Sequence, residues 1–66
     1  MKFFIADYVV EVSSQQQFKI IDYVIHLTSN RLCYVFQSMD GFKYVLSQEE
    51  MEDGRFAMQS STERVG

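Results

Sequence analysis

The chain holds one histidine, His26, and one cysteine, Cys33, the residues best suited to nucleophilic or metal chemistry. Together they could form a thiol–imidazole pair or part of a zinc site. A zinc site needs a full tetrahedral set of ligands, and no Asn or Asp is placed to orient the imidazole. We therefore interpret His26 as a packed sheet histidine, which could be pH-sensitive at an interface, and Cys33 as a small buried apolar residue. No metal and no cofactor is expected.

The densest run of charge is acidic: Glu49, Glu50, Met51, Glu52 and Asp53. Such a run is typical of a solvated helix face, where acidic residues near the first turn favour the helix dipole. It could also be a docking surface, with Met51 as an adaptable apolar anchor. We take these five residues as the candidate partner-binding patch. A sharper alternative is mimicry of DNA phosphates, with the stripe extended by Asp7, Glu11 and Glu63.

Four aromatic residues lie close together in the sequence: Tyr34, Phe36, Phe42 and Tyr44. They could stack on the bases of a single-stranded nucleic acid, or they could pack in the core and in a self-association surface. Six Lys and Arg oppose nine Asp and Glu, so the net charge is −3, which disfavours nucleic acid. We therefore expect self-association from these aromatic residues.

No catalytic motif is present in the sequence, neither a Gly-rich phosphate loop nor G-x-S-x-G nor H-E-x-x-H. A chain of 66 residues can hardly enclose a pocket that excludes water, so we do not expect an enzyme. No stretch approaches the ~18 apolar residues of a membrane helix, so no membrane partner is expected. A lone thiol fits the reducing cytoplasm.

Short strands must position these residues. Runs of β-branched and aromatic residues predict strands over 2–12, 18–29, 31–39, 42–47 and 55–59. The run 18–29 also fits a helix capped by Ser14, but alternation accounts for it better. The capping box that begins at Ser47 predicts a helix over 48–53, ended by Gly54. Residues 1–59 are then one small β domain, and 60–66 are a flexible polar tail.

Two-residue turns at Asn30 and at Asp40-Gly41 determine the expected registers. Tyr34 should pair with Ile25 or Leu27, and Phe36 with Val45. Both faces of the sheet then carry apolar side chains, and one small chain cannot bury both. We therefore expect a homodimer, formed through an apolar sheet face or by strand addition between first strands.

The sequence thus predicts an all-β fold, an antiparallel meander or a small SH3-like barrel of four or five strands, with one short helix near the C-terminus. The SH3-like comparison is one of element order alone. The expected function is that of a small acidic binding protein, an inhibitor or modulator of a partner protein of the kind that bacteria or phages encode. The alternatives are a nucleic-acid-mimicking inhibitor of a DNA-binding protein, a small nucleic-acid-binding barrel, and a structural subunit of a larger assembly.

Overall fold

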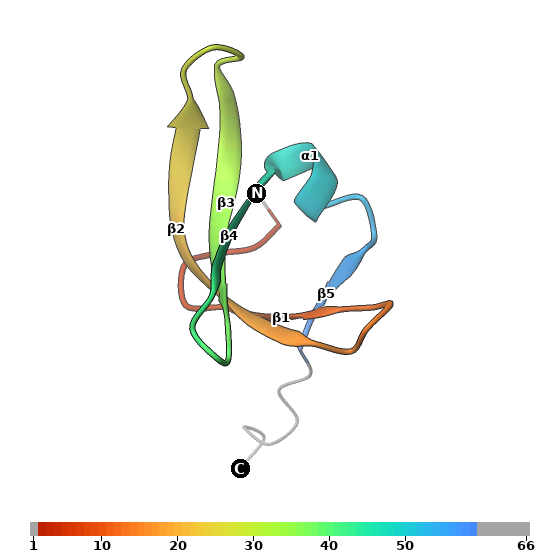
Figure 1. Ribbon diagram of the computed structural model, residues 1–66. Coiled ribbons are helices and arrows are strands. Elements are labelled where there is room, and N and C mark those ends of the chain that lie inside the picture. Colours follow the sequence, from red (N-terminus) through yellow and green to blue (C-terminus); the bar gives the residue numbers. More distant parts are fainter. Residues whose placement is uncertain (1, 60–66) are drawn as a thin grey trace.

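The computed structural model describes residues 2–59, which form five strands and one short helix (Figure 1). In chain order these are β1 Tyr8–Glu11, β2 Gln17–His26, β3 Arg31–Ser38, β4 Lys43–Ser47, α1 Gln48–Met51 and β5 Phe56–Met58. The strands form one antiparallel sheet in the order β4-β3-β2-β1-β5. The expected all-β fold with a short helix near the C-terminus is confirmed. The tail expected over 60–66 lies outside the described residues.

Strand β2 is the longest element and confirms the strand prediction for this segment over the helical alternative. Its register against β3 shifts between Ile20 and Asp22, an irregularity of the β-bulge type that increases bending. On the N-terminal side of the shift, β2 pairs with both β1 and β3, whereas on the C-terminal side it pairs with β3 alone. The part of the β2–β3 hairpin beyond the register shift, residues 22–35, projects past α1 (Figure 1). We call it the hairpin arm.

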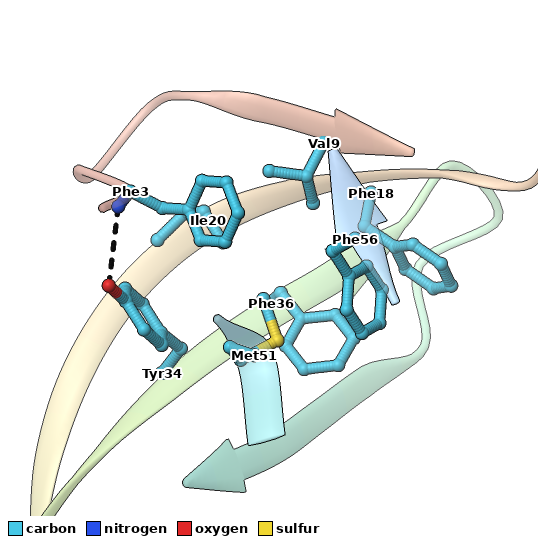
Figure 2. Packing of buried hydrophobic residues seen from close by; sticks show 8 residues of the cluster. All are labelled: Phe3, Val9, Phe18, Ile20, Tyr34, Phe36, Met51 and Phe56. Carbon is cyan, nitrogen blue, oxygen red and sulfur yellow. Dashed lines mark hydrogen bonds between the residues drawn. The ribbon is translucent and has the colours of Figure 1, made fainter. Parts of the chain in front are cut away.

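The core lies between the sheet, α1 and the N-terminal residues, and it is rich in aromatic rings (Figure 2). Phe36 meets Phe18 and Phe56 edge to face, with centroids 5.2 and 5.4 Å apart. Edge-to-face pairs add to the stabilisation that burial supplies. The buried cluster comprises Phe3, Val9, Phe18, Ile20, Tyr34, Phe36, Met51 and Phe56.

The strand predicted over 2–12 is wrong in its first half, because it begins only at Tyr8. A turn precedes it, in which the Asp7 N–H donates to the Phe4 carbonyl at 2.9 Å. The Asp7 carboxylate accepts the Phe4 N–H, also at 2.9 Å, and Ala6 has a φ of 80°. The short acidic side chain thus offers the backbone a local alternative to the ladder. We call residues 2–7 the N-terminal strap.

The β2–β3 turn spans Leu27–Asn30, so the expected two-residue turn is wrong. His26 pairs with Arg31, and Tyr34 pairs with Tyr23 rather than with Ile25 or Leu27. Because the register moves by an even number of residues, the expected faces of this part of the hairpin are retained.

The β3–β4 register is also wrong, and here the error changes the faces. The loop has three residues, since Ser38 donates its N–H to the Phe42 carbonyl at 2.8 Å and accepts from the Gly41 N–H at 3.0 Å. Gly41 has a φ of 98°, the left-handed position that such loops need. Phe36 therefore pairs with Tyr44 instead of Val45. The shift by one residue moves Tyr44 to the core face and Val45 to the opposite face.

The position of β1 excludes one route to the expected dimer. Strand β1 lies between β2 and β5 and is paired on both sides, so strand addition between first strands is wrong. The two edges of the sheet are β4 and the three-residue β5.

Candidate functional site

The helix that carries the acidic run begins where the capping box places it. The Glu50 N–H donates to the Ser47 hydroxyl oxygen at 3.3 Å, and Ser47 has an extended backbone. The Ser47 hydroxyl in turn donates to the Glu50 carboxylate at 3.1 Å. Helix α1 ends at Met51, before the predicted end at residue 53. Gly54 has the expected left-handed backbone, with a φ of 109°, but it lies two residues beyond the C-cap Glu52, so the prediction that it ends the helix is wrong.

The five residues of the candidate acidic patch do not share one surface. Met51 is fully buried in the core, so its expected role as a partner-facing anchor is wrong. Its side chain points inward because α1 is a single turn that must bury one apolar residue to pack on the sheet. Glu52 is half-buried, and its carboxylate accepts the Tyr34 hydroxyl at 2.5 Å. The exposed acids are Glu49, Glu50 and Asp53.

Two of the three exposed acids form ion pairs with neighbouring arginines. Glu49 pairs with Arg31 on the hairpin arm, and Asp53 pairs with Arg55 at 3.1 Å. The backbone N–H of Arg55 also donates to Asp53, and this bond lowers the pKa of the carboxyl group. Exposed pairs contribute little stability. Their effect on function is to reduce the free negative charge that the acidic run presents.

A polar network, absent from the sequence-based expectations, holds the N-terminal strap on the core. The Tyr34 hydroxyl accepts the Phe3 N–H at 3.2 Å (Figure 2) and donates to Glu52. Glu52 also accepts the Lys2 N–H at 3.0 Å. The Tyr23 hydroxyl donates to the Phe3 carbonyl and accepts the Ile5 N–H, both at 3.1 Å. The signal that pointed to it was the expected common face of Tyr23 and Tyr34.

The network shifts two acid–base equilibria. Burial, followed by the hydrogen bond to Glu52, raises the pKa of Tyr34. The hydrogen bonds from the Tyr34 hydroxyl and from the Lys2 N–H lower the pKa of Glu52. Tyr34 and Glu52 thus act as a structural donor and acceptor that fasten the strap.

The four aromatic residues assigned to self-association are divided between two environments. Tyr34 and Phe36 are buried in the core, so they are not available to a second copy, and that part of the expectation is wrong. Phe42 and Tyr44 are exposed, by 62% and 44%. Tyr44 stacks on Phe36, with centroids 5.6 Å apart, because the three-residue loop turns it to the core face.

The two residues suited to nucleophilic chemistry lie apart from any cluster. Cys33 is buried on β3 opposite Val24, as a small apolar residue would be. His26 is exposed at the end of β2, so the packed position is wrong, and its Nδ1 lies 3.0 Å from the Ser29 hydroxyl. Among residues 2–59, no three His, Cys, Asp or Glu side chains gather closely enough to hold a metal ion.

The chain matches no protein-family model, no curated protein and no solved structure. Within the described part of the chain, no helix has the length and apolar character needed to cross a membrane.

The surface of residues 2–59 includes a polar hollow and an apolar hollow. One, of about 330 Å³, lies between the hairpin arm and α1 and is lined mainly by polar residues: Asn30, Arg31, Leu32, Ser47, Gln48 and Glu49. The other, of about 300 Å³, is an apolar groove between β4 and β5, with Phe18, Phe36, Tyr44 and Phe56 in its lining and Glu11 at its side. We call the second hollow the seam groove, because it occupies the seam at which the sheet does not close.

Of the residues that the structure describes, more large apolar side chains are exposed than are buried. One exposed group lies on the hairpin arm, with Leu27 exposed by 92%. A second lies on the β3–β4 hairpin, and a third surrounds the strap and β1. In this order the groups are Val24, Ile25 and Leu27; Met39, Phe42, Tyr44 and Val45; Phe4, Ile5, Tyr8, Val12 and Met58. Exposed apolar surface of this extent is typical of proteins that bind other proteins.

Proposed function

We propose that this chain is a small cytoplasmic binding protein that acts by protein–protein contact, as an inhibitor or modulator of a partner protein and without a catalytic step. The observation that carries the proposal is the excess of exposed over buried large apolar side chains within residues 2–59. The buried Cys33 thiol supports a reducing compartment.

The partner surface that we propose combines the hairpin arm with the exposed acid beside it. Ile25 and Leu27 supply the apolar contact, and Glu50, an exposed acid outside the two ion pairs, supplies negative charge beside them. The tip of the arm, where Ile25 pairs with Leu32 and His26 with Arg31, is two-stranded because β4 reaches only to Cys33. A two-stranded tip is marginally stable by itself, so cover by a partner would stabilise it. The complementary partner surface would be an apolar pocket rimmed by basic residues.

Mimicry of DNA is a weaker alternative, because carboxylates of the proposed stripe already form hydrogen bonds or ion pairs within the chain. Glu52 bonds the strap, and Asp53 pairs with Arg55. The alternative of nucleic-acid binding is weaker for a similar reason, since basic side chains are also engaged within the chain. Arg31 and Arg55 are paired with acids, and Lys19 lies over the Tyr8 ring, 5.7 Å from its centroid.

The test is a tagged pull-down from bacterial lysate, treated with nuclease and eluted at rising salt. We expect one protein at near-equal stoichiometry. The double variant Ile25→Ser with Leu27→Ser should weaken its binding by at least ~10-fold, because both side chains are contact residues. The matched control, Val12→Ser with Met58→Ser, removes two apolar side chains of the third group and should leave binding within ~2-fold.

Three outcomes would contradict the proposal. Equal effects of the two double variants would mean that the arm is not the contact surface. Loss of all binding after nuclease treatment would favour the nucleic-acid alternative. A captured partner that normally binds DNA, together with loss of binding in Glu49→Lys but not in the arm variant, would favour mimicry.

A further inference from the structure

Strand β4 ends the sheet with its outer side unpaired by any described strand. The bond from the Ser38 N–H to the Phe42 carbonyl identifies these two residues as a hydrogen-bonded pair. In an antiparallel ladder the backbone groups of alternate residues point to the same side, so Tyr44 and Leu46 bond to β3. Lys43 and Val45 therefore direct their N–H and C=O groups away from the sheet, as does the N–H of Ser47, whose carbonyl begins helix α1 as its N-cap.

This edge lacks most of the features by which sheets avoid further pairing. Natural edges are protected by proline, by bulges, by charges or by very short strands. The chain contains no proline, and the β3–β4 register is continuous over five residue pairs. The one charged residue of β4 is Lys43, at its start. The opposite edge, β5, has only three residues, so β4 is the longer free edge.

Exposed apolar side chains stand on both faces of the β4 edge. Val45 is exposed by 55% on one face and Tyr44 by 44% on the other. An added strand would cover both, because cross-strand neighbours contact each other on each face of a sheet. Its side chains on the Tyr44 face would enter the seam groove, which has an apolar aromatic lining.

We infer that β4 pairs with β4 of a second copy, antiparallel and related by a two-fold axis through Val45. In this register Val45 lies opposite Val45 of the second copy, Tyr44 opposite its Leu46, and Lys43 opposite its Ser47. The register spans all five residues of β4, and outward-directed residues meet each other, as the ladder requires. A symmetric register that placed Lys43 against Lys43 would pair less of the strand and oppose like charges.

Charge favours a second copy as the occupant. Lys43 begins β4, and the exposed acid Glu50 follows its other end, whereas the neighbouring Glu49 is paired with Arg31. Antiparallel pairing of two copies brings the basic end of each strand to the acidic end of the other, at two symmetric places. The arrangement uses each β4 edge once, so assembly closes at a dimer. This inference goes beyond the proposed function, because it requires no other protein.

The test is sedimentation equilibrium of the full chain between ~1 μM and ~1 mM, the range in which small interfaces dissociate. We expect a monomer–dimer equilibrium without larger species. The variant Val45→Pro removes an N–H that points outward, a position at which an edge strand tolerates proline. Because it removes two bonds of the symmetric ladder, it should weaken the dimer by roughly 30-fold. The matched control, Val45→Thr, keeps the N–H and should change dimerisation by less than ~5-fold.

Amide hydrogen exchange of the unmodified chain gives a second, independent readout. We expect the amides of Lys43 and Val45 to become protected as concentration rises, whereas the amide of Leu27 does not. A monomer at all concentrations would overturn the inference. So would a dimer in which Lys43 and Val45 exchange at the monomer rate, or one that folded Val45→Pro forms as well as the parent. Protection of these amides only when another protein is added would replace the second copy with a strand of that protein. If Val45→Pro does not fold, the exchange result decides alone.

Discussion

The N-terminal strap and the β4 edge border the same core, but only the strap side is closed. On the strap side, the polar groups of Lys2, Phe3 and Ile5 are bonded to the hydroxyls of Tyr23 and Tyr34 or to Glu52. Phe3 is fully buried there and meets Tyr34 edge to face, with centroids 5.8 Å apart.

On the β4 side, outward backbone groups have no neighbouring strand within residues 2–59, and large apolar side chains face solvent. Polar side chains thus close the strap side of the core by hydrogen bonds, and the β4 side stays open to contact with another molecule. The buried Tyr34 hydroxyl and the half-buried Glu52 carboxylate therefore stabilise the fold, and the open edge is the side that we propose for binding.

The largest expected effect is on the free energy of unfolding, when an aromatic ring on the strap side is truncated and compared with one on the β4 side. Phe3→Ala should cost about 3–5 kcal/mol of unfolding free energy, because it leaves a cavity under the strap. A loss of this size approaches the whole stability of a small domain. The matched variant Phe42→Ala truncates an exposed ring on the open side and should cost less than ~0.5 kcal/mol in the monomer. Urea unfolding followed by circular dichroism measures both. Similar losses would show that the strap is not part of the core.

The next effect tests the polar network of the strap. Tyr34→Phe leaves the buried Phe3 N–H without an acceptor and should cost about 1–3 kcal/mol. Combined with Glu52→Gln, the loss should be smaller than the sum, since the two residues share a hydrogen bond. The control Glu49→Gln breaks only the exposed pair with Arg31 and should cost ~0–1 kcal/mol. Strictly additive losses in the double variant would contradict the coupling.

Acid should loosen the strap through Glu52. Its pKa in the folded chain is lowered from the ordinary value of 4.5, so the unfolded chain binds the proton first as the pH falls. The stabilisation is therefore complete above that value and is lost as the pH falls through the folded pKa. Glu52→Gln should flatten the fall of unfolding free energy in acid. An unchanged slope in Glu52→Gln would contradict the assignment.

Base should act on the same network through Tyr34. Its folded pKa is raised above 10.0, so the unfolded chain loses the phenolic proton first. Stability is therefore retained below that value and falls as the pH rises toward the folded pKa. Chemical unfolding across this alkaline range should show the fall in the parent chain and a weaker fall in Tyr34→Phe.

The smallest effect concerns the turn by which the strap enters β1. Ala6 has a φ of 80°, which glycine adopts without the Cβ penalty. Ala6→Gly should therefore stabilise the chain by roughly 0.5 kcal/mol, the relief of left-handed strain less the added backbone entropy. Ala57→Gly, in the ladder opposite Val10, should destabilise it by a similar amount. Thermal unfolding of the two variants gives the signs, and a lower midpoint for Ala6→Gly would contradict the strained turn.

The features that could be predicted from the sequence are those with local causes. Alternation of apolar residues predicts β2, and the hydroxyl of Ser47 with the acid three residues later predicts the start of α1. The Asp40-Gly41 pair predicts the position of the β3–β4 turn. It does not predict its length, because Gly41 serves a three-residue loop as well as a two-residue loop. That one residue decides whether Tyr44 or Val45 faces the core.

The sequence by itself determined the order of the elements, the places where the chain turns and the acidic balance of charge, because each depends on residues a few positions apart. Only the tertiary structure decided that Met51 is buried, that Glu52 fastens the strap and that β4 is the open edge. These depend on contacts between distant residues, such as the bond from the Lys2 N–H to Glu52, 50 positions away. They also depend on strand registers, in which a shift of one residue moves every side chain to the other face.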